Sequence, residues 1–229
     1  MLIQELQLHA NDLSALKTFY CDSLGFKMVA NNADNFTVQC GTSKLTFLKT
    51  HLINAKPYYH FAFNIPSNQI KDAHNWLKTK QIEAMPTEID EATNQPIYIA
   101  AFDAWQAEAV YFYDPAGNIV EFIARHEFSR PSSKPFSMEN VISISEIGLV
   151  AVEKDSKEYA AELREKYDLT SFQKGTNRTD FWALGADNGL LLAFREGRKY
   201  FPTDLPAARF PLKVFFENRK NIDCELQIW

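Results

Sequence analysis

The stretch Tyr111-Phe112-Tyr113-Asp114-Pro115-Ala116-Gly117-Asn118-Ile119-Val120-Glu121-Phe122-Ile123 decides how this chain is interpreted. It predicts two β-strands joined by a tight turn, because β-prone residues alternate on both sides of Asp-Pro-Ala-Gly-Asn. In that turn proline presets φ, glycine supplies a positive φ, and the Asp and Asn side chains can bond their own backbone. Glu121 is unusual, since a carboxylate in an apolar strand is costly unless it faces water, a partner or a metal ion. We therefore look for function around Glu121.

Composition limits the class of protein. The 229 residues fit one large or two small domains, and the net charge of -5 without a Lys/Arg stripe argues against a nucleic-acid partner. Cys21, Cys40 and Cys224 have neither metal-type nor disulfide-framework spacing, so we expect free thiols in a reducing cytoplasm. We find no signal peptide at Met1 and no apolar run of membrane-spanning length. We expect a soluble cytoplasmic protein without a membrane partner.

One pattern of elements repeats along the chain. Residues 2–10 alternate as a strand, Asn11-Asp12 begins a helix that ends at Gly25, and strands are expected near residues 27–30, 36–40 and 44–48. The same β-α-β-β-β order restarts at His60, carries a polar insertion at 87–95 and closes with the hairpin quoted above. A third copy begins near Ile144, with strands expected at 171–174, 181–184 and 190–194. A fourth copy begins at 212–216 and is truncated. This internal repeat is the strongest organisational signal.

The repeat predicts an α+β fold of tandem β-α-β-β-β units. The stretch 129–135 is rich in Ser and Pro and is the best linker. We expect residues 1–128 to form the first two units. Residues 129–137 form the linker, and 138–229 hold the third unit with a partial fourth. An unpaired final strand makes self-association as a homodimer plausible.

This arrangement resembles the vicinal oxygen chelate superfamily, which includes glyoxalase I, bleomycin-resistance proteins, extradiol dioxygenases and fosfomycin-resistance enzymes. The resemblance spans roughly residues 3–125, and the third unit carries it weakly. It implies that the two units of residues 1–128 are paired, with curled mixed sheets that form a metal and substrate cup. The first and last strands of each unit would hold a divalent metal ion. It rests on Asp12-Leu13, Phe19-Tyr20…Leu24-Gly25-Phe26, His60, and Asp114-Pro115-Ala116-Gly117-Asn118…Glu121.

Carried over to this sequence, the resemblance implies that Glu5, His60 and Glu121 are the metal ligands. Glu5 departs from the family, whose members usually have His or Gln there, and Thr46 stands where glyoxalases have Glu. Strand alternation agrees, because it places all three predicted ligands opposite the residues that pack against helices. One imidazole and two carboxylates suit Mn, Fe(II), Zn, Ni or Mg without choosing among them.

Each candidate has a plainer alternative. Glu121 can be paired with Arg or Lys in a metal-free cup, His60 can be a satisfied core histidine, and Glu5 can be an ordinary exposed strand residue. Thr46 is expected to face water or substrate and not to bind the ion directly.

Other residues are expected to contact substrate or to have a structural role. Gln7 and His9 share the face of Glu5 and are candidates for the substrate pocket, as are Tyr111 and Tyr113. Glu146 occupies the position of Glu5 in the third unit. However, Leu192 and Pro211 stand where the other ligands of that half would be. We therefore expect the second half to lack a ligand set and to be structural or lid-forming.

Three functions remain open. The first is a metal-dependent lyase or isomerase, in which the metal chelates two neighbouring oxygens and Glu121 or Glu5 moves a proton. The second is ring-cleaving oxygenation, which favours two His and one carboxylate around Fe(II), so that Glu5 counts against it. The third, in a different class, is a metal-free module that binds a hydrophobic or cationic small molecule. A protein whose cup is filled by its own side chains is a weaker alternative.

Overall fold

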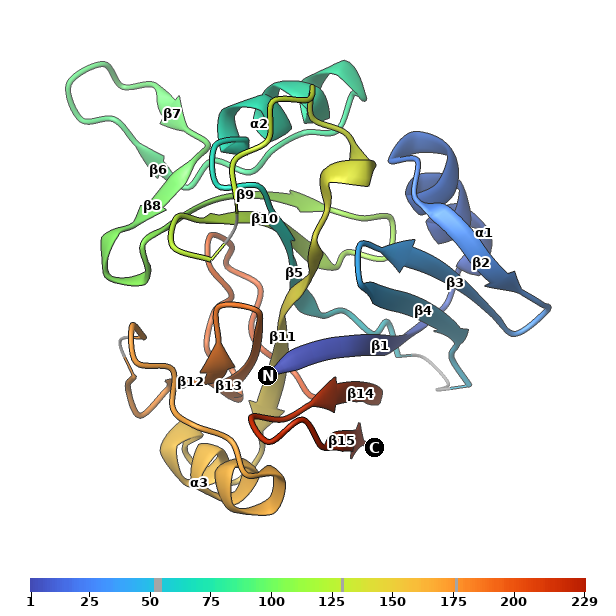
Figure 1. Ribbon diagram of the computed structural model, residues 1–229, viewed down its shortest axis with the longest axis vertical. Helices are drawn as coiled ribbons and strands as arrows, with labels where there is room; N and C mark the ends of the chain where they lie inside the picture. The colour runs from blue at the N-terminus through green and yellow to red at the C-terminus, as the bar shows by residue number, and fades with distance from the viewer. Residues whose placement is uncertain (52–54, 129, 176) are drawn as a thin grey trace.

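The computed structural model describes residues 1–51, 55–128, 130–175 and 177–229. A 13-stranded mixed sheet runs through the molecule, and its longest path follows the order β2-β3-β4-β1-β11-β5-β10-β9-β8 (Figure 1). Ser129, the first residue of the expected linker, lies outside the described residues. The α+β class and the repeated units are as the sequence predicts.

Unit one follows the expected pattern closely. Asp12 caps the helix by accepting a hydrogen bond from the Ala15 N–H, and the helix continues as a π-helical segment. Gly25 then turns the chain with φ of 89°. The elements are β1 (Leu2–Ala10), α1 (Leu13–Lys17), η1 (Thr18–Ser23), β2 (Lys27–Asn31), β3 (Asn35–Cys40) and β4 (Ser43–Lys49).

Unit two contains the hairpin predicted for residues 111–123. Its turn is closed by Asp114, whose carboxylate accepts hydrogen bonds from the backbone N–H groups of Ala116 and Asn118. The polar insertion forms a small separate hairpin of β6 and β7. The elements are β5 (His60–Ile65), α2 (Ile70–Thr79), β6 (Glu88–Ile89), β7 (Pro96–Ile97), β8 (Ala100–Phe102), η2 (Asp103–Trp105), β9 (Ala107–Tyr113) and β10 (Ile119–Arg125).

Units three and four depart from the expectation in two places. The expected strand at 171–174 makes only an isolated bridge from Ser171 to Leu184, because the chain turns at Gly175. The last strand is not unpaired, since β14 lies between β1 and β15. The elements are η3 (Met138–Asn140), β11 (Ser143–Ala151), α3 (Ser156–Tyr167), β12 (Phe181–Ala186), β13 (Gly189–Arg195), β14 (Leu212–Glu217) and β15 (Asp223–Ile228).

The first strands of the units pair across the two halves of the chain. Strand β5 of unit two runs antiparallel to β11 of unit three, with Ala62 opposite Glu146. Strand β1 of unit one pairs with β14, with Glu5 opposite Phe215, and meets β11 at one position only. We expected units one and two to pair with each other within residues 1–128, whereas β5 of unit two pairs with β11 of unit three. Side-chain alternation could not have predicted which first strands pair. The first strands of the units share one alternation pattern, so the pattern does not distinguish one pairing partner from another.

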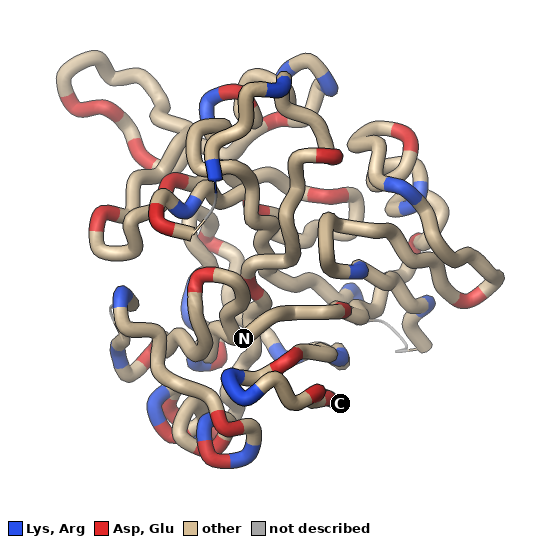
Figure 2. Tube along the Cα trace, in the orientation of Figure 1, with Lys and Arg blue, Asp and Glu red and all other residues tan. Residues whose placement is uncertain are grey.

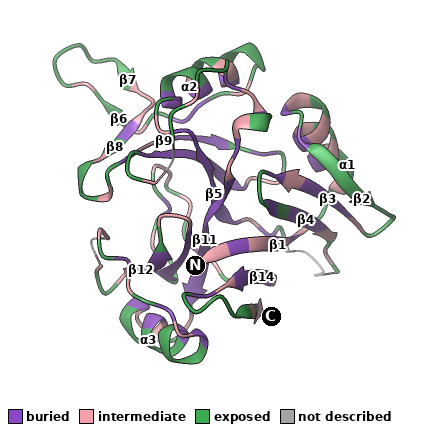
Figure 3. Cartoon of the chain, in the orientation of Figure 1, coloured by how far each residue is buried: buried purple, intermediate pink, exposed green. Residues whose placement is uncertain are grey.

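Two apolar clusters lie on opposite faces of the sheet. Phe61, Phe63 and Phe122 belong to the larger one, which packs under the helices, whereas Ala62 and Ile123 belong to the smaller one inside the cup. The central strands are therefore buried on both faces (Figure 3). Acidic and basic residues both occur on α3 and around the periphery (Figure 2). Among the described residues, the helices are all too short or too polar to cross a bilayer.

Candidate metal and substrate site

Ala62 provides the space in which the candidate site forms. Glu121 on β10 and Glu146 on β11 are both register partners of Ala62, which lies on the strand between them. Strands two apart are separated by roughly 10 Å, so two long side chains on the same face can meet above a small central residue. His60 precedes Ala62 by two positions and shares its face. Three chain segments therefore converge on one point.

His60 has an orientation suited to a metal ligand. Its Nδ1 lies 3.2 Å from the carbonyl oxygen of Ile119, which can only accept, so Nδ1 carries the proton. Nε2 is left as a lone-pair donor and faces the carboxylate of Glu121 at 3.5 Å. Burial lowers the pKa of His60 to about 4, and the charge of Arg198 contributes to the lowering. The imidazole is therefore neutral at physiological pH.

Glu121 is a buried acid with a strongly perturbed protonation equilibrium. Burial raises its pKa well above the ordinary value, and the negative charge of Glu146 raises it further. Arg125 and a hydrogen bond from the Tyr111 hydroxyl act in the opposite direction. Burial dominates, so the carboxyl of Glu121 retains a proton at pH values where an exposed glutamate is ionised.

Glu146 is held by a buried cation. Arg125 follows Glu121 by four positions on β10, and its guanidinium pairs with the Glu146 carboxylate. The guanidinium also lies 5.6 Å from the ring centre of Trp105 and 5.7 Å from that of Phe172. Arg125 is 1% exposed and is held by these aromatic neighbours. Its ion pair in turn fixes the position of Glu146.

The group fits a divalent ion. Donor atoms of His60, Glu121 and Glu146 all lie within 4.8 Å of one another and all three residues are buried. An ion that lies about 2.0–2.2 Å from each donor atom requires the donor atoms to lie within about 4.4 Å of one another. Small side-chain rotations bring them to this distance. Three ligands of mixed N and O type leave coordination positions for substrate.

A pocket of about 350 Å³ opens onto this group. Leu192 and Ile123 are among its apolar lining residues, and Arg178 and Arg198 are its basic ones. The aromatic lining residues come from units two and three and from the segment after β13: Phe102, Trp105, Tyr111, Phe181, Phe194, Tyr200 and Phe201.

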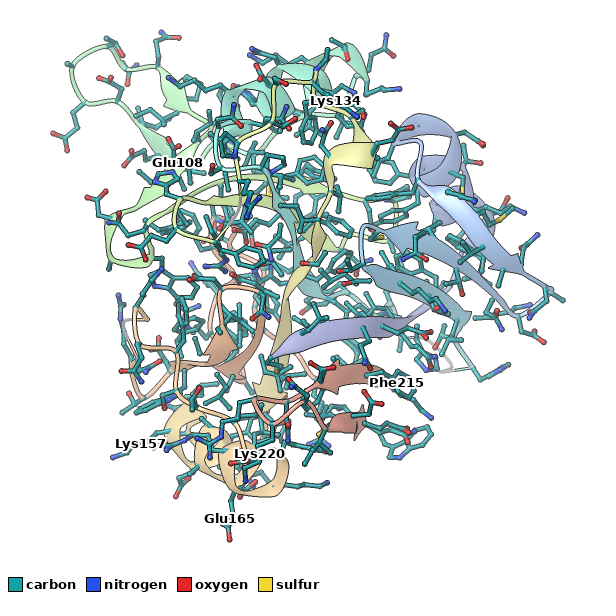
Figure 4. The ribbon with its side chains drawn as sticks, in the orientation of Figure 1. Glu108, Lys134, Lys157, Glu165, Phe215 and Lys220 are labelled. Atoms are coloured by element: carbon teal, nitrogen blue, oxygen red, sulfur yellow. The ribbon has the colours of Figure 1, made fainter. Side chains whose placement is uncertain are left out.

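The structure separates Glu5 from His60 and Glu121, although the sequence analysis grouped the three. Glu5 lies in register with Phe215 of β14, in the sheet region formed by units one and four. Figure 4 labels Phe215. Its Oε1 accepts hydrogen bonds from the Gln7 amide and the Thr46 hydroxyl at 2.8 Å each. The register of β1 with β14, which the repeat does not specify, explains this placement.

The predicted substrate-contacting residues are also separated, since some lie near Glu121 and others lie near Glu5. Tyr111 lines the pocket and reaches Glu121. Tyr113 shares its strand but is 46% exposed at the end of β9. Gln7 and Thr46 are partners of Glu5, and His9 is half-buried on the same strand β1. These three therefore lie away from the pocket lining.

The structure brings Glu146 of the second half into the candidate group, although we expected no ligand set in that half. Glu146 lies with His60 and Glu121, and Leu192 occupies the wall beside them. One signal for Glu146 was present, because it holds the first-strand position of its unit. A signal for Arg125 was present too, since it has the same strand parity as Glu121.

Several solved structures are similar to this chain, and one of them shares its fold over nearly the whole chain. A putative dioxygenase from Bacillus subtilis subsp. subtilis str. 168 matches 99% of this chain and 84% of its own, with a TM-score of 0.59 at 12% identity. A lactoylglutathione lyase from Agrobacterium tumefaciens matches 55% of this chain and 95% of its own, with a TM-score of 0.44 at 22% identity. A fosfomycin resistance protein from Listeria monocytogenes matches 54% of this chain and 89% of its own, with a TM-score of 0.40 at 16% identity. A search of curated protein sequences returned no match.

Fold and site together define an α+β protein of paired β-α-β-β-β units with a buried His/Glu/Glu group that could hold a metal ion. The model of the Glyoxalase/Bleomycin resistance protein/Dioxygenase superfamily matches residues 2–122. This chain belongs to that superfamily.

Proposed function

We propose that this protein is a metal-dependent enzyme that binds a divalent ion through His60, Glu121 and Glu146. Its substrate is a small oxygenated molecule, and the reaction is of the lyase or isomerase type. The convergence of one neutral imidazole and two buried carboxylates at the closed end of a pocket carries this proposal. When bound, the ion supplies Lewis-acid polarisation of substrate oxygens.

Glu121 is the proposed proton-transfer group. Its raised pKa brings proton exchange toward neutral pH, where a general acid or base is most effective. The hydroxyl of Tyr111 holds the carboxyl in place through a hydrogen bond. Glu146 cannot move as freely, because Arg125 binds it. The two acids therefore have different roles in this proposal: Glu121 exchanges a proton, and Glu146 is fixed by its ion pair with Arg125.

Glu5 is assigned no role as ligand or base in the proposed reaction. It is bound to Gln7 and Thr46. This makes Glu5→Gln a matched control for Glu121→Gln and Glu146→Gln, since each exchange removes one carboxylate and keeps the side-chain size.

Elemental analysis of purified protein tests the proposal. After incubation with Mn, Fe(II), Zn, Ni and Mg in turn and removal of excess ion, the wild type and Glu5→Gln should retain about one equivalent of a preferred metal. The variants His60→Ala, Glu121→Gln and Glu146→Gln should each lose it. Retention of metal by all three variants, or loss only in Glu5→Gln, would contradict the assignment. A substrate panel of α-keto aldehyde adducts, catechols and thiol conjugates then separates lyase from ring-cleaving chemistry.

A metal-free binding protein is the second candidate, and one observation favours it. Arg125 already supplies a buried positive charge to Glu146, so the site has a counter-charge of its own. Failure of the wild type to retain any of the five metals would support this candidate.

A further inference from the structure

The mouth of the pocket differs from its closed end in charge. His60, Glu121 and Glu146 are all buried, whereas Arg198 has a side-chain exposure of 24% and Arg178 is exposed. A ligand that fills the pocket therefore meets acids and an imidazole on the buried part of the lining and guanidinium groups on the more exposed part. This gradient gives the ligand a direction.

Arg198 is positioned before any ligand arrives. Its Nε donates to Asp180 at 3.1 Å and its Nη1 donates to the carbonyl oxygen of Lys199 at 3.2 Å. Its guanidinium lies 5.1 Å from the ring centre of Phe181 and 5.3 Å from that of Phe194. These contacts hold the planar group at the rim with little rotamer freedom left to lose on binding.

Arg178 leaves the rim with an excess of positive charge. It lies on the tight turn before β12, where its backbone N–H and carbonyl both bond Phe181. Asp180 on the same turn is paired with Arg198. Within the described part of the chain, Arg178 has no acidic side chain within ion-pairing distance. An anionic group at the rim would therefore meet one guanidinium already neutralised by Asp180 and one that is not.

The walls between the two ends are aromatic, and the volume is small. A pocket of about 350 Å³ lies near the lower end of the usual range for small-molecule sites, so it accommodates one ring with a short side chain more readily than a peptide conjugate. Rings lining a narrow pocket favour a flat apolar body through stacking and edge contacts.

We infer that the ligand of this pocket is a compact aromatic carboxylate whose acid group binds Arg178 and Arg198 at the rim. Its ring fills the aromatic section, and any oxygen substituents point toward His60, Glu121 and Glu146. The direction toward these three residues rests on the proposed function. Recognition of the acid at the rim does not depend on it.

Binding of 3-phenylpropanoate and of its neutral amide, 3-phenylpropanamide, tests the inference. Both are titrated by calorimetry and by intrinsic tryptophan fluorescence, to which Trp105 of the pocket lining contributes. The titrations use chelator-treated protein and metal-supplemented protein. The acid should bind about tenfold more tightly than the amide, since a charged hydrogen bond adds roughly that much. Arg178→Gln and Arg198→Gln should each remove most of this preference and change the affinity for the amide less than twofold. Arg195→Gln, an exposed arginine outside the pocket lining, should change neither.

Three results would overturn the inference. They are equal affinity for acid and amide, no binding of either at 10 mM, or equal weakening of both ligands by the rim variants. If Arg198→Gln fails to fold, two other variants still test the inference. Arg198→Lys keeps the charge without the planar group, and Arg178→Gln changes an exposed residue. Metal analysis of the same samples separates the two proposals. Metal retention without acid preference defeats this inference alone, whereas acid preference without metal defeats the proposed enzyme function alone.

Discussion

His60 donates its Nδ1–H to the carbonyl oxygen of Ile119 across the parallel strands β5 and β10. Because the acceptor belongs to the backbone, ring orientation and tautomer are set by the sheet itself and not by another side chain. A histidine fixed in this way presents Nε2 to the pocket whatever the protonation state of its acidic neighbours. Substitution of Glu121 or Glu146 should therefore leave the imidazole in place.

Metal affinity should increase with pH. Glu121 has a raised pKa through burial, so it carries a proton in the metal-free protein that binding must displace. Release of one proton makes affinity rise by up to about tenfold per pH unit below that pKa. His60, with a pKa lowered to about 4 by burial, is already neutral and adds no dependence above pH 5. Calorimetry in buffers of different ionisation enthalpy measures the released protons. Affinity that does not change at any pH between 5 and 8 would refute this prediction.

Ala62→Val should remove metal binding while the protein remains folded. The added methyl groups enter the space over which Glu121 and Glu146 meet, and overpacking a buried site costs roughly 1–3 kcal/mol. Ala193→Val is the matched control, because Ala193 is equally buried in β13 but belongs to the cluster under the helices. The free energy of unfolding in urea and the metal content are measured for both variants. Equal metal retention by the two variants would show that the size of residue 62 is unimportant.

Asp114 should make the protein less stable as pH rises from 4 to 7. Burial raises its pKa from 3.8 to about 6, against the effect of hydrogen bonds from Asn118 and Tyr20. A group whose folded pKa is raised stabilises the fold fully below its unfolded pKa, and that contribution is lost as pH passes through 6. The loss is at most ~3 kcal/mol in the free energy of unfolding. Urea unfolding at pH 4.5 and 7.5 should show a smaller pH effect in Asp114→Asn than in the wild type or in the exposed control Asp22→Asn. Parallel profiles for all three proteins would exclude Asp114 as the source.

Gly41→Ala should destabilise the protein more than Gly25→Ala. Both glycines have positive φ, 59° and 89°, so both variants incur strain of about 1–2 kcal/mol. A Cβ at Gly41 would also lie 2.1 Å from the backbone oxygen of Ile142, whereas Gly25 has no neighbour within 4 Å of that position. Denaturant titrations compare the two variants. Because Ile142 leads into β11, Gly41→Ala should also weaken metal binding, and equal behaviour of the two variants would contradict this.

The sequence predicted the units well because each is built from local signals. The cap at Asp12, the turn at Gly117 and the parity of His60 and Glu121 depend on neighbours within one unit. The site could not be predicted completely, because Glu146 reaches it through the pairing of β5 with β11. That pairing depends on which first strands meet, and their similar patterns do not distinguish the partners. Arg125 shows the same difficulty, since its parity was readable but its acidic partner lies on another unit.

The pairing of unit two with unit three has a consequence for synthesis. On the ribosome, His60, Glu121 and Arg125 emerge before Glu146, so a nascent chain that ends before β11 holds an arginine without its acid and an incomplete set of ligands. Under the proposed function, an ion can be captured only after strand β11 has joined β5. Metal loading would therefore be a late event in the life of the chain, and a translation product truncated before β11 would lack Glu146.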